Sequence, residues 1–240
     1  MLFPSKTSAQ KHEARLKRLS LWDRPIDGVA HRLRAWTNML FVDHAIVRLF
    51  YRNFHKVTPE LWRSAQPTPG QIARLAREGV KTIVTLRGGR EFGSWPLERE
   101  ACERHGLALV EITARSREAP SLDMVRDLDA LFDRIAYPAL IHCKAGADRA
   151  GLVAALHLIL KRGASVDEAM AQLSPRYGHW RWSPTGILDA FLLQYRDEGE
   201  SRGLSLLDWM EKVYDPARLN ATFRPHAFSS FVVDRVLRRE

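Results

Sequence analysis

Cysteine is scarce in this chain, which has only Cys102 and Cys143 among its 240 residues. So few cysteines exclude a disulfide scaffold and favour a reducing compartment. No run of about eighteen uncharged apolar residues occurs, so a membrane-spanning helix is not expected. The first twenty residues are basic but lack the apolar core of a secretory signal. These absences predict a cytoplasmic protein.

Negative charge is also in short supply. The chain has 37 lysines and arginines against 28 aspartates and glutamates, which gives a formal net charge of +9. No basic run is interleaved with aromatic residues in a nucleic-acid-binding motif, so no nucleic acid partner is expected. A basic field also suits a small anionic substrate or the face of an anionic membrane, and charge alone does not separate these two.

Residues 1–54 are predicted to form a basic N-terminal arm and an amphipathic helix. Residues 1–25 have the composition of a mobile basic arm, whereas residues 26–52 predict a helix or helical pair. This segment would either pack on the main domain or contact a membrane surface, because basic and aromatic groups coincide there. Its apolar residues at helical spacing are Val29, Leu33, Trp36, Leu40, Ile46, Leu49 and Phe50.

Residues 55–198 alternate between strand and helix patterns, and residues 199–240 are predicted to form a C-terminal helical extension. Strands separated by helices imply an α/β domain with a mostly parallel central sheet flanked by helices. The expected strands are 60–67 (an edge strand ending at Pro67), 80–86, 107–113 and 138–143. The expected helices are 68–79 with Thr68 as its cap, 96–106, 120–136 capped by Ser121, and one from about Arg149 to Gly163.

The stretch LIHCKAGADRAG, residues 140–151, places Cys143 where a buried strand turns into a helix. In a parallel sheet, ligands collect at such strand ends. Gly146 and the alanines beside it allow a tight turn whose backbone N–H groups form an anion nest, to which the helix N-terminus adds its positive end. A thiol in this field becomes a nucleophile, and the Arg149 guanidinium matches two phosphate oxygens. The pattern therefore predicts attack on phosphorus.

The order His, Cys, five residues, Arg resembles the signature of the cysteine-dependent tyrosine and dual-specificity phosphatases. The segments WRSAQPTPGQIARLAREGVKTIVTLR and SREAPS look like the flanks of the bacterial members, so the resemblance covers residues 55–195. It implies a dual-specificity-phosphatase-like fold in which Cys143 forms a phosphocysteine intermediate and Arg149 holds the phosphate. This chemistry implies no metal and no cofactor. The phosphate-binding loop would comprise His142, Cys143, Lys144, Ala145, Gly146, Ala147, Asp148 and Arg149.

One position departs from that family. Its members usually have Ser or Thr directly after the arginine, where the hydroxyl stabilises the thiolate as it leaves the intermediate, whereas this chain has Ala150. We expect slower hydrolysis of the intermediate rather than loss of the first step. A phosphate-binding pseudophosphatase with slow turnover is the alternative that this position raises.

The general acid is left open between two carboxylates. The leaving oxygen needs a proton, and the family usually supplies it from a loop before the cysteine. In this chain that loop is TARSREAPSLD, in which Glu118 is the candidate, whereas Asp123 is explained by its place in the first turn of a helix. Asp148 is the rival, because the myotubularin-type lipid phosphatases also have Asp before the arginine.

Other residues are weaker candidates. Arg87 follows a neighbouring strand and is expected to face the substrate, and His179 or Arg181 could wall the pocket. Cys102 is expected to be a buried helix residue. The expected substrate is a phosphorylated protein, with a phosphoinositide or inositol phosphate as the alternative. The sequence gives neither the physiological substrate nor the oligomeric state.

Overall fold

The structure is a computed structural model that describes residues 8–225, so the parts of the predictions that fall on residues 1–7 and 226–240 lie outside the described residues. The chain divides into two compact units. The first comprises Met1–Tyr51, Pro67–Glu78 and Gly89–Ala108, and the second comprises Arg52–Gln66, Gly79–Gly88 and Leu109–Glu240. The three regions expected from the sequence remain a prediction.

A five-stranded sheet has the order β1-β2-β5-β3-β4. Its central strand β5 pairs in parallel with both β2 and β3, and β1 runs antiparallel to β2. The predicted α/β class, with a mostly parallel sheet flanked by helices, is confirmed. The strands are β1 His55–Lys56, β2 Leu61–Ala65, β3 Thr82–Thr85, β4 Ala108–Glu111 and β5 Ala139–Cys143.

The prediction of an edge strand at residues 60–67 is wrong. β2 lies between β1 and β5, and all five of its residues are buried. Pro67 suggested an edge because proline cannot donate to a neighbouring strand, but it follows the last paired residue, Ala65. The two-residue β1 occupies the edge instead. A strand this short is not visible in the sequence, because two residues cannot show the alternation of apolar and polar side chains that is typical of a strand.

The strand register determines where the functional loops emerge. Ala65 at the end of β2 lies opposite Cys143 at the end of β5, and Thr85 at the end of β3 lies opposite His142. The chain therefore leaves three adjacent parallel strands at the same edge of the sheet. This is the edge at which ligands collect in such sheets.

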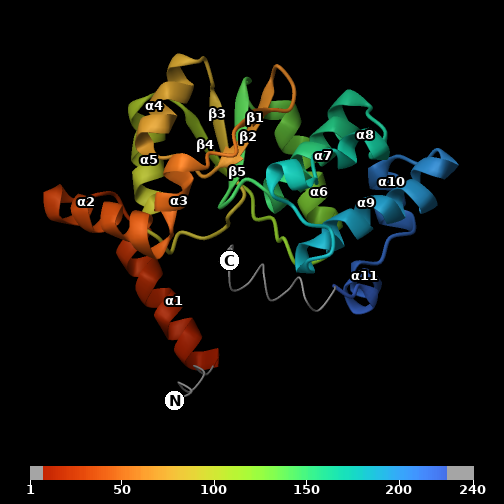
Figure 1. The fold of residues 1–240 in the computed structure, drawn as a ribbon, viewed down its shortest axis with the longest axis horizontal. Coiled ribbons are helices and arrows are strands. Elements are labelled where there is room, and N and C mark those ends of the chain that lie inside the picture. Colours follow the sequence, from red (N-terminus) through yellow and green to blue (C-terminus); the bar gives the residue numbers. More distant parts are fainter. Residues whose placement is uncertain (1–7, 226–240) are drawn as a thin grey trace. The chain divides into compact units, whose positions relative to one another are not determined.

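The helices of the second unit are arranged around α7, whose residues 150–157 are all buried. α7 packs against β5 and β2 and is flanked by α6 and α8 (Figure 1). Ser121 caps α6 and Gly163 ends α7 in the left-handed conformation with φ 62°, both as predicted. These helices are α6 Leu122–Arg134, α7 Asp148–Arg162, α8 Val166–Met170, α9 Ile187–Glu198, α10 Leu206–Lys212 and α11 Pro216–Thr222, with three short 3-10 helices at Pro175–Tyr177, Pro184–Gly186 and Glu200–Arg202.

Within the predicted mobile basic arm of residues 1–25, the structure describes the helix α1 Ser8–Trp22, and the mobility of the arm stays a prediction. Ala, Gln, Lys, Arg and Leu are strong helix formers, and no glycine or proline interrupts them before Pro25. Arg15 and Arg18 of this helix form ion pairs with Glu91.

The predicted helical pair over residues 26–52 is present as α2 Gly28–Thr37 and α3 Ala45–Phe50, with the π-helix η1 Asn38–Val42 between them. α2 packs on α5 Ser94–Arg104, and an apolar cluster joins residues of α1, α2, η1, α3 and α5: Trp22, Ala35, Met39, Ala45 and Leu97. The first unit also contains α4 Pro69–Arg77, which Thr68 caps as predicted. Within residues 8–225, no helix combines the length and the hydropathy that a bilayer crossing requires.

Candidate active site

The loop between β5 and α7 folds tightly around Cys143. Gly146 has φ 71°, a left-handed conformation, and its N–H donates to Cys143 Sγ at 3.2 Å. A Cβ atom at this position would lie 2.5 Å from the backbone nitrogen of Ala65, so only glycine fits. The Cys143 side chain is buried, and the following residues Lys144 and Ala145 are half-buried.

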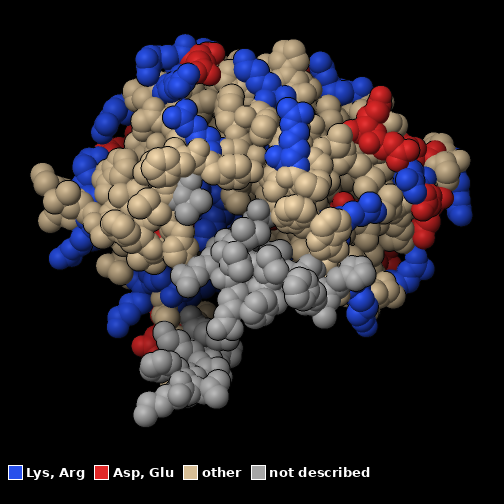
Figure 2. Space-filling model, in the orientation of Figure 1, with Lys and Arg blue, Asp and Glu red and all other residues tan. Residues whose placement is uncertain are grey.

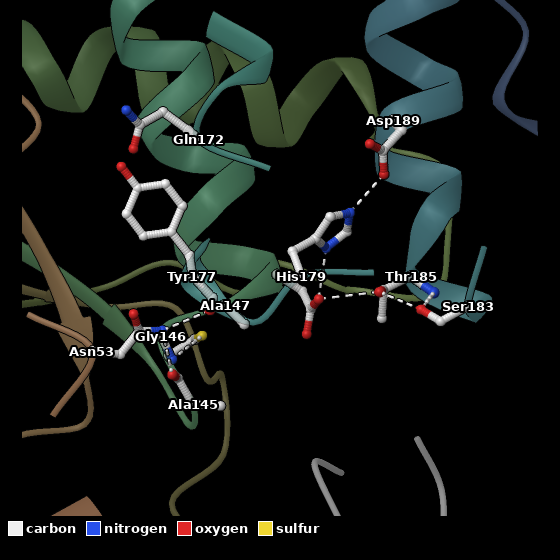
Figure 3. A network of polar contacts seen from close by, with 12 residues as sticks. Asn53, Ala145, Gly146, Ala147, Gln172, Tyr177, His179, Ser183, Thr185 and Asp189 are labelled. Atoms are coloured by element: carbon white, nitrogen blue, oxygen red, sulfur yellow. Dashed lines mark hydrogen bonds and ion pairs between the residues drawn. The ribbon is translucent and has the colours of Figure 1, made fainter. Parts of the chain in front are cut away.

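Two side chains donate hydrogen bonds to the carbonyl groups of this loop. Arg63 on β2 is fully buried and donates to the carbonyls of Gly146 at 2.7 Å and Ala147 at 2.9 Å. Asn53 Nδ2 donates to the carbonyl of Ala145 at 2.9 Å (Figure 3). In a trans peptide the N–H points opposite to the C=O. The N–H groups of residues 146, 147 and 148 are therefore turned away from Arg63 and Asn53, and that of Gly146 reaches the sulfur.

The same two side chains also tie the loop to more distant parts of the second unit. Arg63 donates to the carbonyl of Gln172 at 2.7 Å and lies 4.1 Å from the ring centre of Tyr177. Asn53 donates a second hydrogen bond, to the carbonyl of Tyr177 at 2.9 Å. The loop conformation is therefore set by contacts that the loop's own sequence does not contain.

Asp148 begins α7 and belongs to a buried polar network. Its Oδ1 lies 2.7 Å from His179 Nδ1 and accepts a hydrogen bond from the Thr185 hydroxyl at 3.0 Å. His179 Nε2 lies 2.6 Å from Asp189 Oδ2 on α9, and Figure 3 shows the imidazole pointing at that carboxylate. His179 thus bridges two carboxylates, one in the loop and one on α9.

Burial alone would lower the pKa of His179, but hydrogen bonds and charge from Asp148 and Asp189 outweigh it and raise that pKa to about 9. The ring is therefore an imidazolium at neutral pH, and both of its nitrogens donate. Only 1% of the His179 side chain is exposed. The prediction that His179 walls the pocket is wrong, because the charge of two nearby carboxylates draws the ring into the protein interior.

Arg149 follows Asp148 in the first turn of α7 and is half-buried. Its Nε is buried and has no hydrogen-bond partner among the residues that the structure describes. Ala150 is fully buried next to it. The Arg149 guanidinium therefore lies at the loop, and its Nε–H is available to donate to a bound ligand.

Arg87 follows β3 and is half-buried beside the loop. It donates to the side chain of Gln66, which follows β2, and the N–H of Gln66 donates to the carbonyl of Lys144 at 3.4 Å. The structure thus brings Arg87 to the strand edge that carries Cys143.

Glu118 lies on the segment between β4 and α6. That segment begins beside β3, where the N–H of Ile112 donates to Thr85 and that of Ala114 to Leu86. The Glu118 side chain is 53% exposed and pairs with Arg115 at 2.8 Å. The loop that carries Glu118 therefore leaves the sheet next to the strand end that precedes Arg87.

Cys102 lies in α5, as expected, and both cysteines are free thiols. Burial raises the pKa of the Cys102 thiol far above its usual value, so this thiol is inert at neutral pH. In residues 8–225, no group of three or more His, Cys, Asp or Glu side chains is arranged to hold a metal ion.

Sequence reasoning missed Arg63, Asn53 and Asp189. A signal for Arg63 was present, because an arginine inside an otherwise buried strand requires acceptors that a loop can supply. Asn53 carried no such signal, since its left-handed φ of 46° is a property of the folded chain. Asp189 reads as an ordinary acidic residue in the first turn of a helix.

Comparisons with known proteins match this region of the chain. A family model described as "DSP-PTPase phosphatase fused to NAD+ Kinase" matches residues 51–179. The dual specificity protein phosphatase TpbA of Pseudomonas aeruginosa (strain UCBPP-PA14) is 31% identical over 124 residues, which are 50% of this chain and 53% of TpbA. The chain thus spans about half the length of the curated relatives it matches.

Solved structures share the fold. The catalytic core of the PP-IP phosphatase SIW14 from S. cerevisiae, in complex with citrate, has a TM-score of 0.50 at 22% identity, over 66% of this chain and 94% of that one. The active form of Tk-PTP has a TM-score of 0.50 at 21% identity, over 61% of this chain and 97% of that one. The region that the family model matches is more than half of the chain and includes Arg63, Cys143 and His179. The protein belongs to the DSP-PTPase phosphatase family.

Proposed function

We propose that this protein hydrolyses phosphomonoesters through a phosphocysteine intermediate on Cys143. The observation that carries the proposal is the hydrogen bond from the N–H of Gly146 to Cys143 Sγ, in a loop whose carbonyls are held away by Arg63 and Asn53. N–H groups directed at a sulfur favour its thiolate, which is the nucleophilic form.

In the first step, the thiolate of Cys143 attacks phosphorus, an S–P bond forms, and the ester P–O bond breaks as the leaving oxygen takes a proton from a general acid. In the second step, water attacks phosphorus and gives up a proton, the S–P bond breaks, and inorganic phosphate and the thiolate are released. Arg149 and the N–H groups of residues 144–149 would bind the three equatorial phosphoryl oxygens, which share the negative charge in the transition state. The unsatisfied Nε of Arg149 supports this role.

We assign the general acid to Glu118. Asp148 is buried, and its Oδ1 already contacts His179 Nδ1 and accepts from the Thr185 hydroxyl, so this carboxylate is engaged within the protein. The Glu118 carboxyl is exposed, on a loop that leaves the sheet near the site. Such a loop can bring an acid to a bound substrate.

A phosphorylated protein is the substrate class we propose, because the curated relatives are dual specificity protein phosphatases. A phosphoinositide or inositol phosphate is the second candidate. It is favoured by Lys144 in the loop and by Arg87 beside it, since extra positive charge suits a substrate with several phosphates. A thiol nucleophile must stay reduced, which is the reason to propose a cytoplasmic setting.

The first test is turnover of p-nitrophenyl phosphate by the full chain and by Cys143→Ser, with acid quenching to trap the phosphoenzyme. We expect steady turnover and a trapped phosphoenzyme in the first protein and neither in the second. A single stoichiometric burst would indicate that Ala150 limits the second step. Phosphate binding without burst or turnover would contradict the proposal and identify a phosphate-binding module.

A further inference from the structure

Exposed apolar side chains are concentrated in one segment of the first unit. Eight of the thirteen large hydrophobic side chains that are exposed in the described chain lie within residues 28–51. Single exposed apolar residues need no explanation, but so many within one short segment suggest an interaction site. They include Val29 at 75%, Leu33 at 63%, Phe41 at 62%, Val42 at 55%, Ile46 at 45% and Phe50 at 88%.

This apolar stripe, the exposed hydrophobic side chains of residues 28–51, lies opposite the face that packs. In α2 and η1 the buried positions are His31, Ala35 and Met39, spaced by four residues along one face. Val29, Leu33 and Phe41 recur at the same helical spacing on another face and stay exposed. A surface helix normally places polar residues there, so packing of α2 on α5 does not account for the stripe.

Within the apolar stripe itself the exposed charge is positive, although Asp27 is exposed just before it and Arg32 pairs with Glu100 of α5. The only carboxylate in residues 28–51 is Asp43, which is fully buried and bonded to Arg48 and Ser94. Arg34, directly after Leu33 and one turn from Ala30, is exposed and has no ion-pair partner among the described residues. Figure 2 shows the surface over α2 and α3 mostly in tan, with basic side chains at its margins.

We propose that the apolar stripe, together with Arg34, docks on the surface of an anionic lipid membrane. Apolar and aromatic side chains enter the boundary between headgroups and acyl chains, and a basic side chain beside them contacts lipid phosphates. A protein partner would need complementary shape and acidic groups, whereas a fluid anionic surface needs only exposed apolar area and positive charge. The segment supplies both of these and exposes no negative charge.

The test is flotation of the full chain with vesicles of phosphatidylcholine alone and with about 30 mol% phosphatidylglycerol added. We expect binding to the anionic vesicles that weakens when salt rises from about 0.05 M to about 0.5 M. Phe41→Ser with Phe50→Ser should weaken binding at least tenfold, and Arg34→Glu should reduce its salt dependence. Circular dichroism melting curves check that these surface variants remain folded.

The matched control is Val213→Ser with Arg202→Glu, an exposed hydrophobic and an exposed basic residue after α9, which should bind vesicles like the unmodified chain. The proposal is wrong if no anionic vesicles float with the protein, or if the control and the stripe variants bind equally. It is also wrong if light scattering shows an oligomer that Phe41→Ser with Phe50→Ser dissociates, since the apolar stripe would then be a protein interface.

Discussion

A single hydroxyl at position 150 should change the rate of one chemical step. Ala150 is fully buried in the first turn of α7, directly after Arg149. In Ala150→Ser the new hydroxyl would donate to the Cys143 sulfur as the S–P bond breaks, and one such bond of about 1.4 kcal/mol corresponds to a tenfold faster second step. We expect the burst to shrink and steady turnover to rise in a rapid-quench experiment.

The matched control for that change is Ala154→Ser, which adds the same hydroxyl one turn further along α7. An equal acceleration in both variants would contradict the assignment, because only position 150 is next to the loop. If both variants lose the same amount of stability, that loss measures the cost of burying a hydroxyl in α7. A difference in burst size between the two variants then reports the role of position 150.

The two carboxylates can be separated by the leaving group. A general acid matters most when the leaving oxygen is basic, so Glu118→Gln should slow phenyl phosphate by about 10²- to 10⁴-fold and p-nitrophenyl phosphate much less. Asp148→Asn disturbs the hydrogen bonds with His179 and should slow both substrates by a similar factor. The reverse pattern, with Asp148→Asn showing the dependence on leaving group, would move the acid to Asp148.

At the scale of elements, the buried imidazolium joins the loop to α9, and its charge makes stability depend on pH. The pKa of His179 is raised from 6.5 to about 9 in the folded chain. Its contribution is therefore complete below about pH 6.5 and is lost as the pH rises through about 9, because the folded state holds the proton longer than the unfolded state. The size of this contribution is on the order of 3 kcal/mol.

Urea unfolding between pH 6 and pH 10 measures this effect. As the pH rises, the free energy of unfolding should fall more steeply for the unmodified chain than for His179→Gln. Subtracting one curve from the other cancels the contribution of the titratable groups that both proteins contain. Asp189→Asn should give an intermediate slope, because one of the two carboxylates remains. His157, whose pKa burial and nearby cations lower to about 4, titrates below this range. Equal slopes in all three proteins would show that the ring is neutral.

The helices and their capping residues could be predicted from local sequence patterns, whereas the side chains that hold the Cys143 loop in place could not. Thr68, Ser121 and Gly163 act at helix ends through contacts within a few residues, so their positions are visible in sequence. Arg63 and Asn53 act on a loop more than eighty residues away, as their hydrogen bonds show. Which distant residues come into contact depends on the order of the strands in the sheet. The sequence patterns did not give this order, and they wrongly predicted an edge strand at β2.

At the scale of the whole molecule, the two units allow an anion to stabilise one part of the chain selectively. The loop, Arg63 and the His179 network all belong to the second unit. A phosphate analogue that binds only the folded loop adds stability by mass action, about 2.7 kcal/mol at one hundred times its Kd. For a protein of this length that corresponds to a rise in Tm of roughly 5–10 °C.

Differential scanning calorimetry with orthovanadate can detect this rise and identify the part of the chain that responds. If the units unfold in separate transitions, only the one that includes the sheet should move, and in Arg149→Ala neither should. Arg202→Ala is the matched charge control, since it removes one exposed arginine far along the chain from the loop and should keep the full shift. An undiminished shift in Arg149→Ala would place the anion elsewhere and remove the phosphate-binding role proposed for this loop.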